Sequence, residues 1–451
     1  RDAQKKYVML CMTRISQQEC RGILEYGGYM KTAGIIAEYN PFHNGHAYQI
    51  EEVRRQTGAD YVIIVMSGDF VQRGEPSIVD KYLRTRMALE GGADIVLELP
   101  VLFACAGAEY FARGGVSILN NLGCVDTLCF GTEQKDLSDF EPAADLLTEE
   151  PPAYRQCLAS YLREGMGYPA ARSAALSDCL DTDISFLRKP NNILALEYLC
   201  ALKRLGSSIT PVSIQRVGSG YHDHSLTGQF ASATAIRNSL FERNTRFQES
   251  LVSDTLHGYM PESAIVLLKK HFDAYGPLCI QNFSSILQYR LLTIQSPEEL
   301  SSYFDIDSFL ANRIFQNRFA FSSFSDFTEL LTSKNLTRGH IQRALFHILL
   351  NLSEPEGTAM FFPQYTRILG MKRESSGILK CMKNSSSIPI LTKMADAFKV
   401  IDASTLSEGQ KKAACCQLQQ TTLSSHVYES VLSQKYNTIF RHENTRQIVI
   451  L

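Results

Sequence analysis

This chain of 451 residues has neither an excess of basic residues nor a long apolar run. Basic residues do not outnumber acidic ones, with 45 Lys and Arg against 47 Asp and Glu, and the formal net charge is −2. A uniformly basic nucleic-acid-binding surface is therefore excluded, and any such surface must be a local patch. No apolar run reaches the ~20 residues that a membrane-spanning helix needs, since the run Leu99–Ala108 is short and follows Glu98.

Motifs for metals and for common nucleotide sites are also missing. The 12 cysteines form no CxxC pair, which predicts free thiols in a reducing compartment rather than disulfides or a zinc site. The chain has no Walker A sequence, no GxGxxG turn and no spaced set of metal ligands. We therefore predict no protein-bound metal, and any nucleotide must be recognised through a different motif.

The first 29 residues differ from the rest of the chain. Lys5 and Lys6 precede an apolar stretch that is too short for a secretory signal, and no small-residue cleavage site follows it. A strong strand pattern begins directly after Met30. We therefore expect residues 1–29 to be an N-terminal extension outside the folded part of a soluble, cytoplasmic protein.

From Thr32 onward, short β-branched runs alternate with longer amphipathic segments. Strands are predicted at residues 32–38, 60–66, 94–99, 126–130 and 209–216, and helices at residues 44–57, 78–90, 108–122, 136–147 and 190–205. The alternation predicts βαβ units and an α/β, Rossmann-like parallel sheet in an ATP-binding catalytic domain over residues 30–250. Such sheets bind ligands at the carboxyl ends of their strands, so we expect chemistry after Glu38, Met66, Leu99 and Phe130.

Beyond this region the periodicity becomes mainly helical. Helices are predicted at residues 262–271, 284–293, 307–318, 339–351 and 370–383, the last of them basic, with one short strand at residues 388–391. The pattern predicts a mainly helical C-terminal domain over residues 251–451.

The motif His43-Asn44-Gly45-His46 follows the first predicted strand and opens the first helix. Two imidazoles three residues apart in the first turn of a helix lie on one face, and Gly45 between them lets a ligand approach the backbone. The N-terminus of the helix adds unpaired N–H groups and a positive dipole end. Together these features favour a polyphosphate whose α-phosphorus is attacked, with His43 and His46 as the catalytic pair. An Asn-Gly turn with two incidental surface histidines is the alternative.

A second motif, Ser232-Ala233-Thr234-Ala235-Ile236-Arg237, opens a later helix. Hydroxyl and N–H groups at a helix start, followed by an arginine, form a clamp for the β- and γ-phosphates. Alone the hexapeptide is weak evidence, because Ser and Thr commonly cap helices. Paired with the first motif, it resembles the second signature of the HxGH nucleotidylyltransferase superfamily.

Longer segments narrow this resemblance. In order along the chain occur AEYNPFHNGH, MSGDFVQRGEP, GADIVLELP, YFARGGVSILN, FGTE, KPNNIL and RVGSGYHD. They resemble the tRNA(Met) cytidine acetate ligase family, from Met30 nearly to the C-terminus. The resemblance implies that acetate is activated with ATP to acetyl-adenylate and that the exocyclic amine of the wobble cytidine in elongator tRNA(Met) is then acetylated, giving N4-acetylcytidine. Mg²⁺ is expected to accompany the ATP, which chelates it.

The resemblance also implies an ATP site. Its first part is the loop and helix start that consist of Ile36, Ala37, Glu38, Tyr39, Asn40, Pro41, Phe42, His43, Asn44, Gly45, His46, Ala47, Tyr48 and Gln49. Gly131, Asn191 and Arg216 complete it, together with Ser232, Thr234 and Arg237. Each of the last residues has a local alternative. Gly131 could form a turn that ends a strand, and Arg216 could be solvated. Asn191 could be a helix N-cap, and Asn192 could take either role of Asn191.

Charged residues elsewhere are less specific. In the polar loop 67–76, Gln72 and Arg73 are candidates for holding acetate or the incoming nucleotide, and a surface lid without contact is equally compatible with the sequence. For Lys81, Arg84 and Arg86 on the next predicted helix, solvation is the default expectation.

Two basic clusters predict contact with tRNA phosphates. The first consists of Arg338, His340, Arg343 and His347, and the second of Arg367, Lys372, Arg373, Lys380, Lys383 and Lys393, which accompany Phe362 and Tyr365. A solvated helix face is the alternative for each single residue. Two other functions remain open: a small-molecule adenylyltransferase of cofactor biosynthesis, which needs no RNA platform, and a non-catalytic RNA-binding adaptor with a retired nucleotide site.

Overall fold

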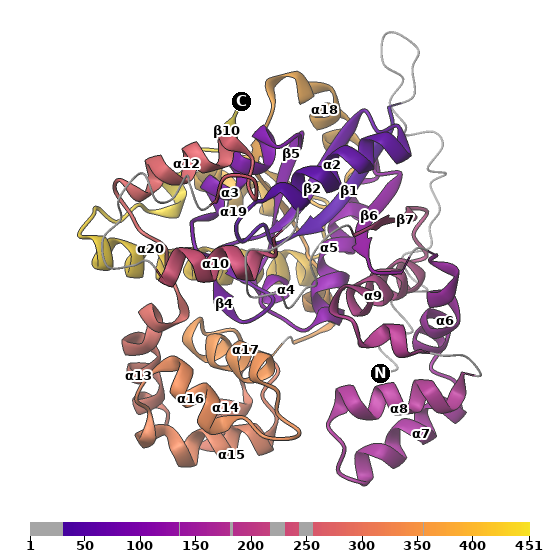
Figure 1. Ribbon diagram of the computed structural model, residues 1–451, viewed down its shortest axis with the longest axis vertical. Helices are drawn as coiled ribbons and strands as arrows, with labels where there is room; N and C mark the ends of the chain where they lie inside the picture. The colour runs from indigo at the N-terminus through magenta and orange to yellow at the C-terminus, as the bar shows by residue number, and fades with distance from the viewer. Residues whose placement is uncertain (1–29, 135, 181–183, 217–230, 243–255, 355) are drawn as a thin grey trace.

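The computed structural model describes residues 30–134, 136–180, 184–216, 231–242, 256–354 and 356–451. The predicted extension over residues 1–29 lies outside the described residues. The described helices and strands form a central sheet with helices on both faces and a group of helices below it (Figure 1).

Five parallel strands form the centre of the sheet. They lie in the order β5 (Ile95–Leu99), β2 (Tyr61–Ser67), β1 (Thr32–Ala37), β6 (Thr127–Thr132) and β7 (Thr210–Gln215). The strand order reverses at β1, whose partners β2 and β6 are both parallel to it. This is the predicted Rossmann-like arrangement, in which ligands bind outside the carboxyl ends of the strands near the reversal. The end of β1 is where the His43–His46 motif begins.

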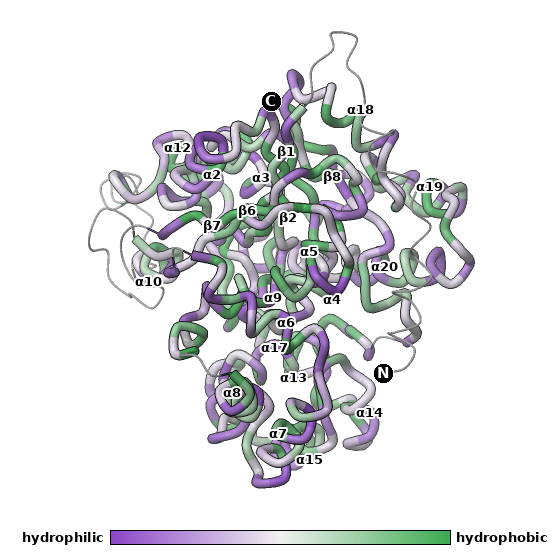
Figure 2. The backbone as a smooth tube through the Cα atoms, turned by 90° about the vertical axis from the view of Figure 1, so that its right-hand side faces the viewer, coloured by the Kyte–Doolittle hydropathy of each residue, from purple (hydrophilic) through white to green (hydrophobic). Residues whose placement is uncertain are grey.

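The strands β1, β2 and β5 are buried on both faces, which explains their nearly continuous apolar sequences, whereas β7 is largely half-buried or exposed. In β2, Ile63 and Val65 pack into one core, and Val62 and Ile64 pack into a second core on the opposite face. Figure 2 shows the hydrophobic segments concentrated in these strands. The first core is completed by α4 (Val101–Ala104), α5 (Ala108–Leu122), α6 (Glu141–Glu149) and α9 (Pro190–Leu205), and the second by α2 (Asn44–Thr57), α3 (Lys81–Glu90), α10 (Ala233–Glu242) and α12 (Glu262–Phe272).

Three strands from the C-terminal part extend the same sheet. β8 (Thr366–Met371) pairs antiparallel with β5, and β10 (Val449–Ile450) and β9 (Ile390–Leu391) pair parallel with β8. The predicted basic helix over residues 370–383 is therefore wrong at its start, because Gly370 and Met371 end β8 and the helix α18 spans Ser376–Ser385. The part of the chain after residue 251 is mainly helical, yet it supplies one edge of the sheet.

The remaining described helices lie around this centre. We call α13 (Ser284–Thr293), α14 (Pro297–Ser301), α15 (Ser308–Asn317), α16 (Phe324–Leu331) and α17 (Arg338–Leu349) the helical lobe. In Figure 1 the helical lobe lies below the sheet, with α17 nearest to β4 (Glu75–Pro76), which forms a short hairpin with β3 (Phe70–Val71). The other helices are α7 (Pro152–Arg163), α8 (Tyr168–Cys179), α19 (Ala397–Asp402) and the long α20 (Glu408–Tyr436).

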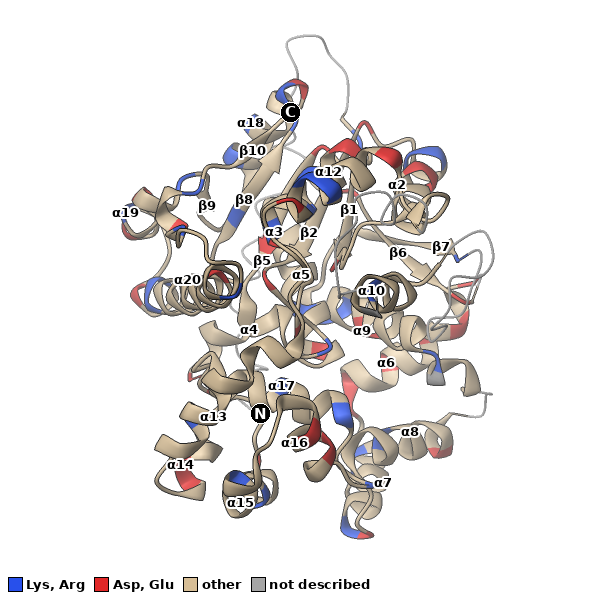
Figure 3. Ribbon diagram, turned by 60° about the vertical axis from the view of Figure 1, so that its left-hand side comes forward, with Lys and Arg blue, Asp and Glu red and all other residues tan. Residues whose placement is uncertain are grey.

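Acidic and basic residues are mixed on the surface, in keeping with their nearly equal numbers in the sequence. Figure 3 shows acidic and basic segments side by side on helices such as α2 and α12. Among the described helices, none combines the length and the apolar character that crossing a membrane requires.

Candidate active site

The two histidines of the first motif lie at the start of α2, directly beyond the carboxyl end of β1. His43 is the N-cap residue, and its ring stacks on that of His46 with the centroids 3.7 Å apart. Each ring accepts one backbone hydrogen bond: Gly45 N–H donates to His43 Nδ1 at 3.1 Å, and His43 N–H donates to His46 Nδ1 at 3.3 Å. The pair therefore forms a reciprocal capping box.

These two hydrogen bonds determine the tautomers. A ring nitrogen that accepts a hydrogen bond carries no proton, so a neutral ring must carry its proton on Nε2. Burial lowers the pKa of His43 to about 3, with smaller contributions from the charges of Arg216 and Arg237. Burial also lowers the pKa of His46 well below its usual value, aided by the charges of His43 and Arg216. Both rings are therefore neutral at physiological pH, and each holds an Nε2–H group as a donor.

Gly45 makes this arrangement possible. A Cβ atom at position 45 would lie 2.9 Å from Cε1 of the His43 ring, closer than real Cβ contacts. The nearest atoms to that position belong to the His43 ring, so the glycine serves the placement of the imidazole. The approach of a ligand to the backbone at Gly45 stays a prediction.

Aromatic rings and a distant loop hold the motif in place. The Tyr39 and Phe42 rings pack against His46, with centroids 4.6 and 5.7 Å away. Tyr259 accepts a hydrogen bond from Asn44 N at 2.9 Å, and Gly258 accepts one from Asn44 Nδ2 at 2.8 Å. The two loop residues lie more than 200 positions further along the chain, and no local sequence signal predicted their contact with the motif.

The second motif adjoins the first. Ser232 Oγ accepts from Ala235 N at 3.0 Å at the start of α10, as a cap would. Arg237 is buried, donates to Asn40 O at 2.9 Å and to Thr234 Oγ1 at 3.3 Å, and forms an ion pair of 3.1 Å with Glu75. The structure therefore joins the α10 motif to the loop that precedes His43, as a clamp for a polyphosphate requires.

The β3–β4 hairpin closes the space between the two motifs. Gln72 N donates to Glu38 Oε1 at 2.8 Å, and Arg73 Nη1 donates to Thr234 Oγ1 at 3.3 Å. Burial raises the pKa of Glu38, against the charge of the nearby Arg73, which lowers it. The loop 67–76 thus contacts both ends of the candidate site, which favours direct participation over a distant surface lid.

The remaining strand ends bring further predicted residues to the site. Arg216 follows β7, and its charge lowers the pKa of both histidines. Gly131 in β6 lies beneath the Arg216 side chain, since a Cβ there would be 3.3 Å from Arg216 Cγ. A flat group can therefore lie against the backbone at Gly131 only if the Arg216 side chain moves aside.

Comparison with known proteins gives the family. The model of the HIGH nucleotidyl transferase family matches residues 30–443. A relative from Thermoanaerobacter sp. (strain X514), named tRNA(Met) cytidine acetate ligase, is 41% identical over 369 residues, which cover 81% of this chain and 89% of the relative. A relative of the same name from Acetivibrio thermocellus is 38% identical over 380 residues, covering 83% and 90%. The chain belongs to the tRNA(Met) cytidine acetate ligase family.

Solved structures agree with this assignment. The apo crystal structure of Thermotoga maritima TmcAL superposes with a TM-score of 0.86 at 31% sequence identity, covering 94% of this chain and all of that one. The structure of the same protein bound with alpha-thio ATP superposes with a TM-score of 0.84 at 30% identity, covering 93% of this chain and again all of the other. The predicted ligase family and fold class are thereby confirmed.

Within this family member, the two asparagines that open α9 have a specific local role. Asn191 Nδ2 donates to Glu133 Oε1 at 2.7 Å, and Asn192 Oδ1 accepts from Glu133 N at 3.0 Å. The N-cap position belongs to Lys189, which makes no side-chain capping bond, so the alternative that either asparagine caps the helix is wrong. Both asparagines instead hold the turn after β6, next to Gly131.

Two basic residues expected in solvent are buried. Lys81 and Arg84 on α3 are both 0% exposed, and of the three basic residues of that helix only Arg86 matches the expectation. Arg84 donates to the backbone carbonyls of Glu38, Ser67, Gly68 and Val79, and so ties the ends of β1 and β2 together. Their partners come from other strands and from the C-terminal part, and the sequence of α3 does not reveal them.

The two predicted tRNA clusters lie at opposite ends of the strands of the sheet, one mainly at the amino ends and the other on the side of the carboxyl ends. Lys372 N donates to Asp94 O at the amino end of β5, and the helix that carries Lys380 and Lys383 lies on the same side. Arg338, by contrast, is exposed at the start of α17, on the side of the carboxyl edge, where Arg343 approaches the β3–β4 hairpin. Since β5 alone spans about 16 Å, the two clusters are well separated, and the α17 cluster is the one on the side of the histidine pair. Arg373 shares the amino edge, where its N–H donates to Leu451 O.

Proposed function

We propose that this chain is an ATP-dependent acetate ligase that modifies tRNA. An acetate oxygen attacks the α-phosphorus of ATP, the bond to the β-phosphate breaks, and pyrophosphate leaves to give acetyl-adenylate. The exocyclic amine of the wobble cytidine in elongator tRNA(Met) then attacks the acetyl carbonyl, loses one proton and displaces AMP. The products are N4-acetylcytidine, AMP and pyrophosphate.

The observation that carries the proposal is the neutral His43–His46 pair. Negative charge grows on the α-phosphate oxygens as the acetate oxygen attacks. Two Nε2–H donors held by the helix cap, together with the N-terminus of α2, stabilise that charge without reorganising. No protein acid or base is needed for this step, because the acetate is already a nucleophile and pyrophosphate leaves as an anion.

We assign the other residues of the proposed ATP site to the phosphates or to the nucleoside by their positions around the histidine pair. Ser232, Thr234 and Arg237 would hold the β- and γ-phosphates, and this requires Arg237 to exchange its ion pair with Glu75 for a phosphate contact. Gly131, Asn191 and Arg216 would border the nucleoside. The segment from Ile36 to Gln49 would form the floor between these two groups.

The expected Mg²⁺ would accompany ATP, and its possible protein ligands can be sought among the described residues. The described residues bring together no group of three candidate metal ligands. The two carboxylates nearest to the clamp are already engaged, Glu38 with Gln72 N–H and Glu75 with Arg237. Our proposal therefore assigns no step to a metal, and any Mg²⁺ would be carried by the phosphate oxygens of ATP.

For the tRNA we propose entry from the side of the helical lobe. The wobble base must reach the carboxyl edge of the sheet, and Arg338 lies on that side. Lys372, Arg373, Lys380 and Lys383 could contact only a part of the same tRNA that is remote from the anticodon. A tRNA substrate also supports a cytoplasmic location.

The test uses purified protein, ATP and labelled acetate. We expect acetate-dependent release of pyrophosphate and formation of acetyl-adenylate, followed by N4-acetylcytidine when elongator tRNA(Met) is added, as measured by nucleoside mass spectrometry. Pyrophosphate release that depends on a phosphorylated small molecule instead of acetate would favour an adenylyltransferase of cofactor biosynthesis. tRNA binding without any ATP turnover would favour the RNA-binding adaptor.

A further inference from the structure

A partly buried arginine of the helical lobe reaches the β3–β4 hairpin without a matching anion. Arg343 on α17 has its Nη1 3.5 Å from Gln72 O, at the limit of a hydrogen bond. Its Nε is buried and has no partner among the described residues. None of the carboxylates in the described part of the chain forms an ion pair with it; burial lowers its pKa, and the charge of Asp305 acts in the opposite direction. The guanidinium is thus partly buried, and its buried donor Nε is unused.

Other arginines show how this fold satisfies a guanidinium that has a structural role. Arg84 donates hydrogen bonds to four backbone carbonyls. Arg313, also on the helical lobe, donates from Nε to Leu331 O at 2.8 Å and from Nη2 to Leu330 O at 2.9 Å. Arg343 has no comparable set, although leaving a buried charge unpaired is costly. This difference indicates that its partner arrives from outside the chain.

The position of Arg343 is held firmly by the hairpin. A Cβ at Gly74 would lie 2.5 Å from Arg343 N, so the hairpin and α17 are in direct backbone contact there. Gln72 links the two sides, because its N–H donates to Glu38 Oε1 at 2.8 Å and its carbonyl oxygen lies 3.5 Å from Arg343 Nη1. Arg343 and Glu38, which follows β1, therefore contact the same residue of the hairpin.

Two other arginines near the hairpin have an acidic neighbour. Arg237 is paired with Glu75, and Arg73 lies close enough to Glu38 to lower its pKa. Arg343 forms no ion pair among the described residues, and the charge of Asp305 only partly offsets the burial that lowers its pKa, so its guanidinium can take an added anion. A guanidinium binds a carboxylate through two parallel hydrogen bonds.

We propose that Arg343 binds the carboxylate of the acyl substrate and presents it to the α-phosphate of ATP, so that the helical lobe contributes directly to the acetate-activating site. This inference rests on the proposed function, since it names the subsite for the small monocarboxylate that the first step consumes. It replaces the predicted role of Arg343 in holding a tRNA phosphate.

The test compares Arg343→Met and Arg343→Lys with Arg313→Met as the matched control. In acetate-dependent pyrophosphate release without tRNA, Arg343→Met should raise the KM for acetate at least about tenfold, the loss expected for charge-assisted hydrogen bonds. The KM for ATP should stay within about threefold. Arg343→Lys keeps the charge without the planar fork and should give a smaller rise. Arg313→Met should leave the KM for acetate unchanged.

Denaturant unfolding separates a binding role from a structural one. Arg343→Met removes an unpaired buried charge and should unfold at the same or a higher urea concentration than the wild type, whereas Arg313→Met should unfold at a lower one. An unchanged KM for acetate in Arg343→Met would overturn the proposal. So would weakened tRNA affinity with a flatter salt dependence and an unchanged KM for acetate. If the wild type releases no pyrophosphate with acetate, the proposed function itself fails, and the inference fails with it.

Discussion

Two buried groups of titratable side chains lie at the carboxyl edge of the same sheet and behave in opposite ways. The His43–His46 pair is uncharged, and its Nε2–H donors are not used by the backbone bonds that hold the rings. The second group, which we call the Lys81 network, is built from ion pairs. Lys81 Nζ lies 2.6 Å from both Glu98 Oε1 and Glu443 Oε1, and Arg367 pairs with the same two carboxylates.

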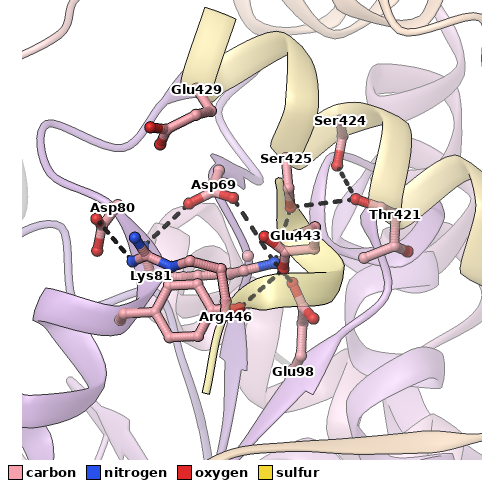
Figure 4. A network of polar contacts seen from close by, with 12 residues as sticks. Asp69, Asp80, Lys81, Glu98, Thr421, Ser424, Ser425, Glu429, Glu443 and Arg446 are labelled. Atoms are coloured by element: carbon pink, nitrogen blue, oxygen red, sulfur yellow. Dashed lines mark hydrogen bonds and ion pairs between the residues drawn. The ribbon is translucent and has the colours of Figure 1, made fainter. Parts of the chain in front are cut away.

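Figure 4 shows the Lys81 network as a closed set, with Lys81 surrounded by Asp69, Glu98, Glu443 and Ser425. These carboxylates raise the pKa of Lys81 against the effect of burial, so the ammonium group stays charged. Every charge in it has a partner, and the partners come from α3, β5, β8, α20 and the turn before β10. The comparison teaches that burial of ionisable groups does not by itself mark a site. A site leaves donors for a ligand, whereas a structural network uses them all.

The largest expected effect tests the structural half of this comparison. Lys81→Met removes the centre of the network and leaves buried carboxylates short of a cation, so the free energy of unfolding should fall by about 3–5 kcal/mol. Urea unfolding measures this. Arg86→Met, which removes an exposed ion pair with Glu90 on the same helix, should change the free energy of unfolding by less than about 1 kcal/mol. Normal stability with lost acetate activation in Lys81→Met would mean that the network belongs to the site.

The next effect tests the catalytic half. His43→Asn keeps a side chain that can cap α2 but removes the Nε2–H donor, so acetate-dependent pyrophosphate release should fall about 10²–10³-fold. Urea unfolding should show a nearly unchanged protein, and tRNA affinity should stay within a few-fold. Near-normal turnover would show that His43 does not stabilise the transition state.

A smaller effect is expected from the glycine between the histidines. Gly45→Ala pushes the His43 ring away from the helix start, and a displacement of this kind should lower turnover about tenfold to hundredfold. The result should appear in kcat rather than in the KM for ATP, because the misplaced donor acts in the transition state. A variant with normal kcat would show that the ring position seen here is not required.

The smallest effect concerns the rim of the site. Asn191→Ala loses the hydrogen bond to Glu133 and should raise the KM for ATP about threefold to tenfold. Asn192→Ala is the matched comparison, because it removes the neighbouring contact to the same turn. Equal and large loss of stability in both variants, with an unchanged KM for ATP, would assign them to folding alone.

Much of the fold was accessible from the sequence, because its signals are local. The helices at residues 44–57, 108–122 and 190–205 begin and end where their periodicity predicted. The placement of the His43–His46 motif at the end of β1 followed from the same alternation. What local patterns cannot show is pairing across the chain. β8 joins the sheet beside β5, and Lys81 is buried because Ser425 and Glu443, hundreds of positions later, close around it.

The same limit applies to the site. The order of motifs predicted which residues meet, but it could not show that Gly258 and Tyr259 hold Asn44, or that Arg343 turns toward the hairpin rather than into solvent. Gly74 was the available signal, since a glycine in a polar loop marks a close backbone contact, but its partner on α17 is invisible in one sequence.

The measurement that tests the central claim most directly is an NMR titration of the protein labelled with ¹⁵N-histidine, with His43 and His46 assigned from variants. We predict that both rings stay neutral, with the proton on Nε2, as the pH is lowered from 8 to 5. Because unfolded histidines would bind protons in this range and these two do not, stability should fall as the pH drops below about 6.5. A ring of this pair that takes up a proton near pH 6.5, or that carries its proton on Nδ1, would contradict the account.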